Sequence, residues 1–415
     1  MRTLKFGIAL LAGASLLLLA GGTPEAFHSG GVAECGGCHS MHSPKPGGQY
    51  LLVGTDGAST CLSCHMHAGD TGPSSYHIAT ADSDMPAGVA PLQRTPGGDF
   101  GWLRKSYTFT VRGTTSTEQG ETHGHNIVAG DTSFVADSVN TTSPGGTFPS
   151  ANLACTSCHD PHERVRRTST GSYTTSNAEP VSGSGSYGAI PAAGTTVGNY
   201  RLLRGLNDTH VTGNTFVGVG IAVAPSSYNR TEASTQTRVA YGATGINTWG
   251  NWCATCHEGM HSSGNYVHPV DQSLSSALAN VYNSYVKSGD LTGSAATSYT
   301  SLVPFAENTG DIATLAAHAK NDDSQLGGPG GSDKVTCLSC HRAHASGWEY
   351  ALRWNMEGEF IVWNSLYPGT DTTPSVPQFA RGRLGAETQA AYYDRPVTKF
   401  ASYQRVLCNK CHAKD

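Results

Sequence analysis

All twelve cysteines of this 415-residue chain fall in six copies of one pattern, C-x-x-C-H. The cysteines are Cys35 and Cys38, Cys61 and Cys64, Cys155 and Cys158, Cys253 and Cys256, Cys337 and Cys340, and Cys408 and Cys411. The histidines that follow them are His39, His65, His159, His257, His341 and His412. Histidine makes up only 18 of the 415 residues, so chance does not account for six such placements.

The C-x-x-C-H pattern is the attachment motif of c-type haem. The two thiols add to the two vinyl groups of one porphyrin, and the histidine becomes the proximal axial ligand of the iron. A zinc ribbon needs paired C-x-x-C units but no trailing histidines. A thioredoxin-like motif would occur once, beside a βαβ pattern that this chain lacks. We therefore predict six covalently bound haems c, held by the twelve cysteines and the six histidines.

The composition predicts little regular secondary structure. Glycine accounts for 51 residues, charged residues for 14% and hydrophobic residues for 38%, and few segments are periodic. The best short helices are 273–290 and 311–321, and 106–113 is the best strand, whereas 168–198 has the composition of a loop. We predict a coil-dominated multihaem cytochrome with a few short helices and minimal strand, in which the row of haems is the core.

The N-terminus has the features of a secretory signal peptide. Arg2 and Lys5 precede an apolar run over 6–20, and small residues follow it. The run of about 15 residues is shorter than a membrane-spanning helix requires, which argues against the alternative of an N-terminal anchor. Cleavage can fall after Ala20, Gly22 or Ala26. We predict a signal peptide over 1–26 and one hexahaem unit over 27–415.

The charge of the chain is mildly acidic, with a formal net charge of −5. No basic stripe and no block of like charge occurs, so we expect no nucleic-acid partner. No other stretch of the sequence is apolar enough to span a membrane, so we expect an exported protein without a membrane span.

Twelve histidines remain as possible second axial ligands, twice the number that six bis-histidine irons require. Five motifs carry a histidine two to four residues after the proximal one, and a residue so close lies on the proximal side of its own haem. A trailing histidine should therefore bind a different haem. The candidates for the second axial position are His42, His67, His77, His125, His162, His261, His268, His318 and His344. We do not expect His28, His123 or His210 to be ligands, and methionine ligation is the minority alternative.

Long stretches of the chain resemble the OmcS-type hexahaem cytochromes, the extracellular nanowire proteins of metal-reducing bacteria. The resemblance covers nearly the whole mature chain. It is carried by "FHSGGVAEC" (27–35), "HAGDTGPSSYHI" (67–78), "DMPAGVAPLQRTPGGDFGWL" (84–103), "GHNIVAGD" (124–131), "VAPSSYNRTEASTQTRVAYG" (223–242), "CLSCHRAHASG" (337–347) and "FASYQRVLCNKCHAKD" (400–415). The match of "FHSGG" to the mature start of the family favours cleavage after Ala26.

The resemblance implies a homopolymeric filament in which every haem is low-spin and bis-histidine ligated. It also implies that one haem of each subunit takes its second ligand from the neighbouring subunit. Carried onto this sequence, the donor is His42 and the acceptor is the haem held by Cys337, Cys340 and His341.

These features together predict an electron-transfer protein rather than an enzyme. We expect a secreted cell-surface or extracellular filament, exported through the periplasm, that conducts electrons along stacked haems. The partners would be other cytochromes and external acceptors such as metal oxides, electrodes or partner cells. Two alternatives stay open: a multihaem reductase of nitrite, hydroxylamine or a sulfur oxyanion, and a monomeric periplasmic shuttle. The reductase would need an iron with an open coordination position.

Overall fold

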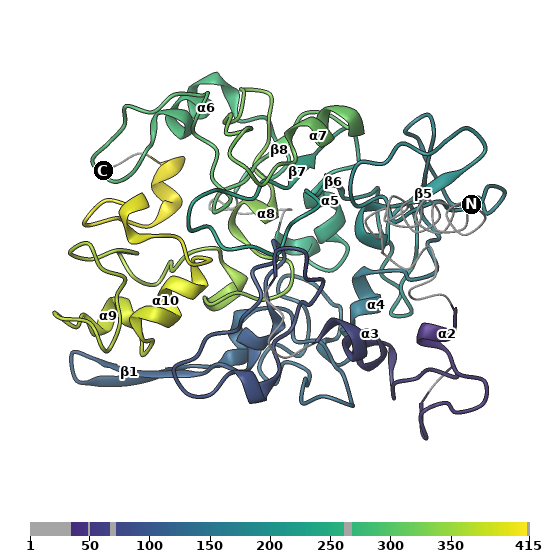
Figure 1. Cartoon of the computed structure of the whole chain (residues 1–415), viewed down its shortest axis with the longest axis horizontal. Coiled ribbons are helices and arrows are strands. Elements are labelled where there is room, and N and C mark those ends of the chain that lie inside the picture. The colour runs from purple at the N-terminus through teal and green to yellow at the C-terminus, as the bar shows by residue number, and fades with distance from the viewer. Residues whose placement is uncertain (1–34, 49, 67–71, 261–267, 413–415) are drawn as a thin grey trace, which may run out of the picture.

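A computed structural model describes residues 35–48, 50–66, 72–260 and 268–412 (Figure 1). The α-helices of these ranges are α2 (Cys35–Cys38), α3 (Gly57–His65), α4 (Cys155–Cys158), α5 (Trp249–Ala254), α6 (Ser275–Ser284), α7 (Ile312–His318), α8 (Cys337–Cys340), α9 (Pro377–Ala380) and α10 (Gly385–Ala391). The strands are β1 (Tyr107–Val111), β2 (Thr114–Glu118), β3 (Arg166–Thr168), β4 (Tyr173–Thr174), β5 (Thr196–Gly198), β6 (Ile221–Val223), β7 (Ala240–Gly242) and β8 (Ala306–Glu307). The prediction of a coil-dominated fold is confirmed.

The elements expected from the sequence are present but shorter. The helix expected over 273–290 is α6, which ends at Ser284. The chain then turns at Gly289, whose φ of +76° favours glycine. The helix expected over 311–321 is α7, which begins after Asp311, whose side chain accepts a hydrogen bond from the Thr314 N–H at 2.7 Å. The strand expected over 106–113 is β1.

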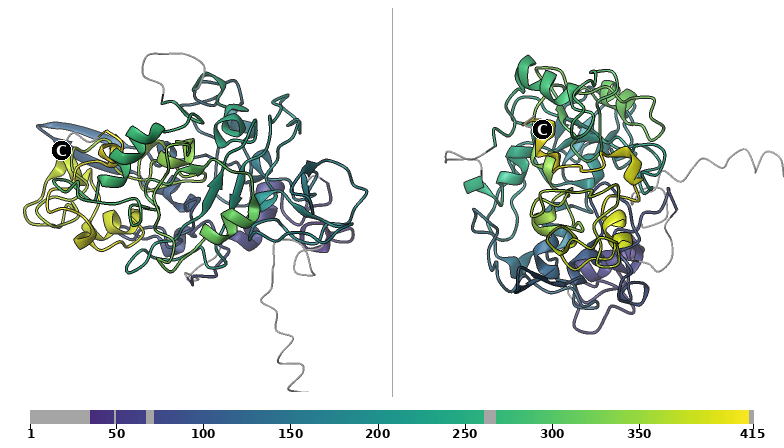
Figure 2. Two further views of the ribbon diagram at one scale, coloured as in Figure 1. Left: turned by 90° about the horizontal axis from the view of Figure 1, so that it is seen from above. Right: turned by 90° about the vertical axis from the view of Figure 1, so that its left-hand side faces the viewer.

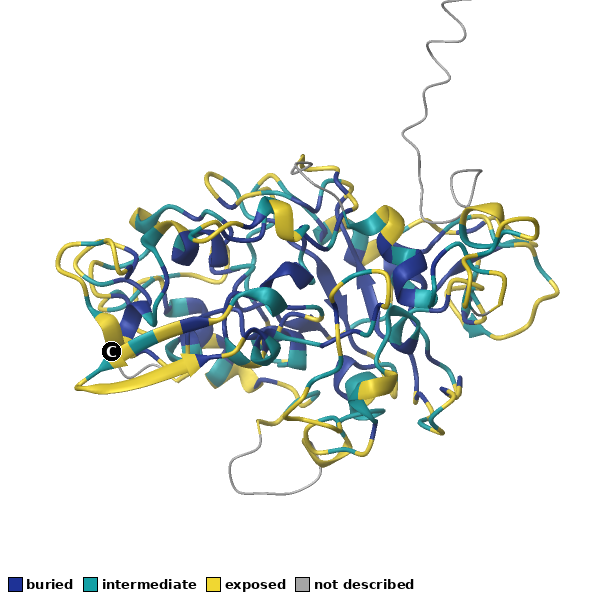
Figure 3. Ribbon diagram, turned by 90° about the horizontal axis from the view of Figure 1, so that it is seen from below, coloured by how far each residue is buried: buried dark blue, intermediate teal, exposed yellow. Residues whose placement is uncertain are grey.

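The strands form small separate sheets. β1 and β2 make an antiparallel hairpin, which projects at one end of the molecule in Figures 1 and 3. A second sheet has the order β4-β3-β5 and is antiparallel. A third has the order β6-β7-β8, in which β7 pairs with β8 in parallel. Each sheet is too narrow to organise a domain, so the strands act as local ties between loops.

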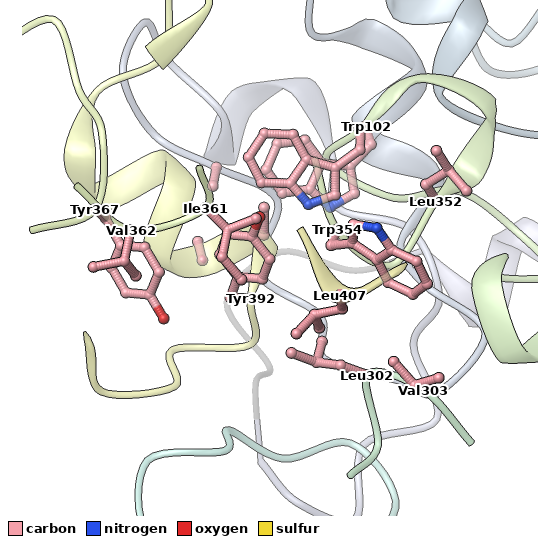
Figure 4. Close-up of a cluster of buried hydrophobic side chains, with 14 of the residues drawn as sticks. Trp102, Leu302, Val303, Leu352, Trp354, Ile361, Val362, Tyr367, Tyr392 and Leu407 are labelled. Carbon is pink, nitrogen blue, oxygen red and sulfur yellow. The ribbon is translucent and has the colours of Figure 1, made fainter. Parts of the chain in front are cut away.

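Buried apolar side chains gather in several clusters rather than in one continuous core. The largest cluster joins Trp102 and its neighbours to residues of the C-terminal half, which include Leu352, Trp354 and Tyr392 (Figure 4). A second packs β6 against α7, and another packs α3 against Phe100 and its neighbours. Among the described residues, no helix combines the length and apolarity that crossing a membrane requires.

The motif-bearing helices follow one another along the molecule. In Figure 1, α2, α3 and α4 lie on the right, α5 and α8 near the middle, and the C-terminus on the left. Figure 2 shows that this direction is also the long direction in the view from above. The fold therefore spreads the six motifs over its length.

Candidate haem-binding sites

Each C-x-x-C-H motif lies in, or at the end of, one short helical turn. We number the motifs site 1 to site 6 in chain order; they belong to α2, α3, α4, α5, α8 and the 3₁₀ turn η9 (Leu407–Lys410). In the four-residue helices of sites 1, 3 and 5, the cysteines are the first and last residues. Residues three apart lie on one face of a helix, so both thiols point the same way. All twelve cysteines are among the described residues, and none forms a disulfide.

The backbone holds the proximal histidine next to this pair of thiols. The N–H of His39 donates to the carbonyl of Cys35 at 2.8 Å, and that of His341 donates to Cys337 at 2.9 Å. In site 5 the Ser339 hydroxyl also accepts the N–H of Thr336 at 3.1 Å, which closes the start of the turn. Two thiols and one imidazole are thus presented together, as attachment of one porphyrin requires.

The proximal imidazoles are oriented by backbone carbonyls. The Nδ1 atoms of His39, His65, His159, His257 and His341 lie 2.7 to 2.9 Å from the carbonyls of Tyr50, Tyr76, Arg201, Pro144 and Tyr350, respectively. A carbonyl can only accept, so Nδ1 carries the proton in each ring. The lone pair is therefore on Nε2, where it is available to a metal.

Sites 1, 3 and 5 share a further structural element, which we call the clamp. It is a pair of consecutive residues with positive φ, followed by a leucine that bridges back to the proximal histidine. The three clamps are Tyr50, Leu51 and Leu52; Arg201, Leu202 and Leu203; and Tyr350, Ala351 and Leu352. The carbonyl of the first residue accepts the proximal Nδ1–H. Non-glycine residues seldom adopt positive φ, so three such pairs in equivalent places indicate a repeated module.

Sequence analysis missed the clamp because it contains no chemically distinctive side chain. A weak signal was present: "YLLV" (50–53), "RLLR" (201–204) and "YALR" (350–353) each follow a C-x-x-C-H-x-x-H motif. The first two motif–clamp separations differ by more than 30 residues, which hides the repeat from inspection of the sequence.

The structure places four motif histidines opposite four histidines predicted as second ligands. The ring centres of His39 and His162 are 6.3 Å apart, and those of His159 and His344 are 6.4 Å apart. The pairs His257 with His125 and His412 with His268 are separated by 6.1 and 6.2 Å, respectively. The ring planes are nearly parallel in the first pair, at 15°, and are inclined by 50° to 62° in the other three.

These separations fit an iron held between two imidazoles. A metal–nitrogen bond of about 2 Å, plus about 1.1 Å from nitrogen to ring centre on each side, gives about 6 Å between ring centres. Directly packed imidazole rings would be closer, because stacked aromatic rings can approach to about 4.5 Å. The residues present therefore fit bis-histidine haem at sites 1, 3, 4 and 6.

Two glycines allow the close backbone approach that seats His344 and His125. A side chain at Gly98 would meet the Ala345 carbonyl oxygen at 1.7 Å, and one at Gly124 would meet the His344 carbonyl oxygen at 2.3 Å. The His344 N–H donates to Gly97, and the His125 N–H donates to His344, at 2.8 and 2.9 Å. One short segment thus positions the candidate second ligands of two different sites.

Burial keeps these two imidazoles neutral. Burial, reinforced by the facing His257, lowers the pKa of His125 to about 4. Burial and the facing His159 likewise lower the pKa of His344 to about 3. Both rings are therefore unprotonated at neutral pH and can serve as nitrogen ligands.

The trailing histidines of sites 3 and 5 face other sites, as the sequence predicted for a trailing ligand. His162, three residues after the proximal histidine of site 3, faces site 1, and His344, three residues after that of site 5, faces site 3. The trailing histidine of site 1, His42, is exposed. Across the described ranges, no second histidine ring faces His341 of site 5 at a comparable distance.

The remaining predicted ligands are placed differently. The Nδ1 atom of His77 lies 3.1 Å from the Ser75 hydroxyl, and the ring is buried. His318 lies on α7 with its Nδ1 2.7 Å from a Glu307 carboxylate oxygen, and belongs to that polar contact. His67 and His261 lie outside the described residues, as do the predicted signal peptide and His28.

Two histidines that we did not expect to be ligands have other partners. His123 is fully buried, with Nδ1 2.9 Å from the Trp102 carbonyl and Nε2 2.7 Å from a Glu118 carboxylate oxygen. With an acceptor at each nitrogen, the ring has no lone pair for a metal. The Nδ1 atom of His210 lies 2.8 Å from the Thr212 hydroxyl, and its ring packs on Phe148.

Consecutive sites are neighbours in space. α3 contacts α4, and α5 contacts α8. The Cys61 side chain interacts with that of Cys155, and the Cys253 side chain with that of Cys337. At the C-terminal end, Cys340 interacts with both thiols of site 6. Cys38 of site 1 interacts with both thiols of site 2, and Cys256 of site 4 interacts with Cys158 of site 3. The motifs therefore form one row rather than separate groups.

Comparisons with known proteins agree with this arrangement. No protein-family model matches the chain. The chain is 51% identical to the C-type cytochrome OmcS of Geobacter sulfurreducens over 98% of its own length and 99% of that protein. A cryo-EM structure of the OmcS nanowires has a TM-score of 0.86 at 50% identity, and covers 94% of this chain and 100% of the other. A structure of the outer membrane cytochrome S filament gives a TM-score of 0.85 at the same identity and coverage. The chain belongs to the OmcS family of c-type cytochromes.

Proposed function

We propose that this protein is an extracellular hexahaem cytochrome that polymerises head to tail and conducts electrons along the filament. Residues 27–415 would form one unit that binds six haems c through the twelve cysteines. The similarity to a cytochrome whose filaments are described as nanowires supports electron transfer rather than enzymatic catalysis. When bound, haem supplies one-electron exchange at its iron.

The axial ligands are proposed from the four facing imidazole pairs. His39 and His162 would hold site 1, His159 and His344 site 3, His257 and His125 site 4, and His412 and His268 site 6. Site 2 would take its second ligand from the predicted histidines that do not belong to these four pairs. The carbonyl acceptors at Nδ1 would orient the proximal rings and raise their basicity.

The observation that carries the polymer is the asymmetry of the C-x-x-C-H-x-x-H motifs. The trailing histidine of site 5 faces site 3, and that of site 3 faces site 1. Repeating the same step sends the trailing histidine of site 1, His42, out of the subunit. Site 5 is the one odd-numbered site whose proximal imidazole has no facing ring among the described residues. One copy thus offers a ligand and the next offers a site, which predicts a heterologous, open-ended assembly.

The chain's own residues would hold the row together and exclude water. Short helical turns would fix the thiols, and the two residues between a proximal histidine and its trailing histidine would tie neighbouring sites at fixed spacing. The buried side chains around α8 and Trp348 would shield site 5 on the subunit side. The protein would be secreted through the periplasm. Other cytochromes and external acceptors such as metal oxides, electrodes or partner cells would exchange electrons with the filament.

The reductase alternative depends on the coordination of the iron at site 5. A multihaem reductase of nitrite, hydroxylamine or a sulfur oxyanion needs an open iron position, and an isolated subunit would have one at site 5. In the proposed filament His42 of the neighbour closes it. A monomeric shuttle would leave it open in every state of the protein.

The test is His42→Ala in the full-length secreted protein. We expect filaments to be absent by electron microscopy, and one haem in six to be high-spin in the ferric spectrum. Ser43→Ala, which leaves the ligand in place one residue away, should form ordinary low-spin filaments. If His42→Ala still assembles with all haems low-spin, the intersubunit ligand is wrong.

A further inference from the structure

The clamp module allows sites 1, 3 and 5 to be compared position by position. In each, the residue after the proximal histidine donates its N–H to the second clamp residue, at 2.7 Å in all three. The residue after the clamp leucine donates its N–H to the second cysteine, at 2.8 to 3.0 Å. The first position is Ser40, Asp160 and Arg342, and the second is Val53, Arg204 and Arg353, in sites 1, 3 and 5. The backbone is the same, so the charge differs at two matched points.

Site 1 has no charge at either position. Site 3 has one of each sign, and both are compensated. Asp160 accepts the backbone N–H groups of His162 and Arg164 at 3.0 and 2.9 Å. The Arg204 guanidinium pairs with Asp208. Neither site therefore carries a net charge at these two positions. Site 3 has one further cation, the clamp residue Arg201, whose guanidinium lies over the Tyr228 ring and acts on His344.

Site 5 has two buried arginines, each 3% exposed. Arg353 donates from Nε to the carbonyl of Leu338 at 2.7 Å, inside the motif, and from Nη1 to Ser301 at 3.1 Å. Arg342 donates to the carbonyl of Pro96 at 3.1 Å and lies 3.7 Å from the centre of the Tyr393 ring. Within the described part of the chain, neither guanidinium has a carboxylate at ion-pairing distance.

The acidic group that interacts with Arg342 does not cancel these charges. Glu232 acts on Arg342 at longer range, but its own carboxylate pairs with Arg395 at 3.4 Å. Counted over the protein side chains alone, site 5 therefore has two more positive charges than site 1 at these positions. Burial limits screening by water and salt, so the field of both arginines reaches the motif.

We propose that Arg342 and Arg353 give site 5 the highest reduction potential of the three repeated sites, so that electrons dwell beside the subunit boundary. The inference rests on the proposed function, in which site 5 binds haem and is closed by the next subunit. A fixed cation favours the reduced iron, which carries one positive charge fewer than the oxidised iron. The axial ligands are of one type, so the surrounding charge decides the order.

The test is an equilibrium redox titration of intact filaments, followed by absorbance. In Arg353→Gln and Arg342→Gln, one-sixth of the absorbance change should move from the positive end of the curve to lower potential. The double variant should move it further, and Arg353→Lys should leave it near its original place. Arg112→Gln, the same change at an exposed arginine in the turn between β1 and β2, should not alter the curve.

A gain-of-charge variant covers the case in which an arginine variant fails to fold. Val53→Arg introduces the cation at the equivalent position of site 1 and should move one-sixth of the change to higher potential. The inference is wrong if the titration curves of the site 5 variants and of Val53→Arg superimpose on that of Arg112→Gln while filaments and low-spin spectra are intact. That result would not contradict the proposed electron-conducting filament. Wild-type protein that forms no filaments would instead overturn the proposed function.

Discussion

The N-terminal lobe (residues 35–48 and 50–53) and the segment around site 5 (residues 337–354) share the motif turn and the clamp but have opposite surroundings. In the lobe, α2 has no buried residue, and Met41 and Tyr50 are 78% and 81% exposed. Around site 5, Leu338 and Leu352 are buried, and Leu352 packs into the largest cluster (Figure 4). The difference teaches that one module can serve as an interior support or as an outward-facing contact, depending on what covers it.

The comparison also separates two equivalent histidines. His344 and His42 each follow a proximal histidine by three residues. His344 is enclosed, with its ring stacked on Phe100 at 4.7 Å, whereas His42 is exposed. The first is therefore committed to its own subunit, and the second is free to act between subunits. The predictions below test this contrast.

The largest effect is expected when each of these histidines is replaced by alanine. His344→Ala removes a ligand inside the subunit. Compared with wild type, one additional haem, that of site 3, should therefore be high-spin, both in isolated subunits and in any assembly. His42→Ala should leave the spectrum of an isolated subunit unchanged and act only on assembly. Ferric absorbance and electron paramagnetic resonance spectra of separated subunits measure this. Equal spectra for the two variants would remove the distinction between inner and outer ligands.

A large effect on stability is expected at Glu118, which belongs to the well-buried side of the comparison. Its carboxylate binds His123 at 2.7 Å and pairs with the buried Arg383. Burial alone would raise the pKa of Glu118, but the His123 hydrogen bond and the Arg383 charge hold it well below its usual range. Glu118→Gln leaves Arg383 uncompensated and should cost about 3–5 kcal/mol at pH 7.

The pH dependence gives this prediction its sign. A depressed carboxyl pKa stabilises the fold above the unfolded pKa of about 4.3, and the contribution is lost as the pH falls. The difference between Glu118→Gln and wild type should therefore shrink below about pH 4. Urea unfolding followed by circular dichroism at several pH values checks this prediction. The control is Glu359→Gln, at an exposed carboxylate that pairs with Arg405. It should change the free energy of unfolding by no more than about 0.5 kcal/mol. A constant difference across this range would contradict the assignment.

An intermediate effect is expected from the clamp leucines. Leu352→Ala should cost about 2–4 kcal/mol, because the side chain is 7% exposed and packed in the main cluster. Leu52→Ala changes the same module position in the lobe, where the side chain is only partly buried, and should cost about 1 kcal/mol or less. The free energy of unfolding of subunits provides the comparison. Equal costs would mean that the lobe is as well packed as site 5.

The smallest effect on the subunit is expected from the exposed apolar side chains of the lobe. Leu51→Ser and Met41→Ser should change the free energy of unfolding by no more than about 0.5 kcal/mol. Met41 precedes His42, and the Leu51 carbonyl accepts the N–H of Ser40 two residues before His42. The next subunit would cover this surface, so the protein concentration needed for filament growth should rise. Val211→Ser, at a side chain 94% exposed outside the lobe, is the control. Unchanged assembly in the lobe variants would place the interface elsewhere.

Much of the fold class was predictable because the motifs are local. Helix positions such as α6 and α7, and the strand β1, were found approximately from periodicity, while their ends depended on turns such as that at Gly289. The sequence did not predict which site each candidate histidine would face. Of the candidates, His318 looked equivalent to His268 in the sequence, yet one lies beside Glu307 and the other faces His412.

By itself, the sequence predicted the number and chemistry of the sites, because two thiols and an imidazole must be adjacent in the chain to bind one porphyrin. Its family resemblance also pointed to filament formation. Only the tertiary structure decided which imidazoles face each other, since those pairs join residues more than 100 positions apart and depend on close approaches such as Gly98 to Ala345. It also decided which module is buried and carries uncompensated charge, because burial is a property of the neighbours that a residue meets.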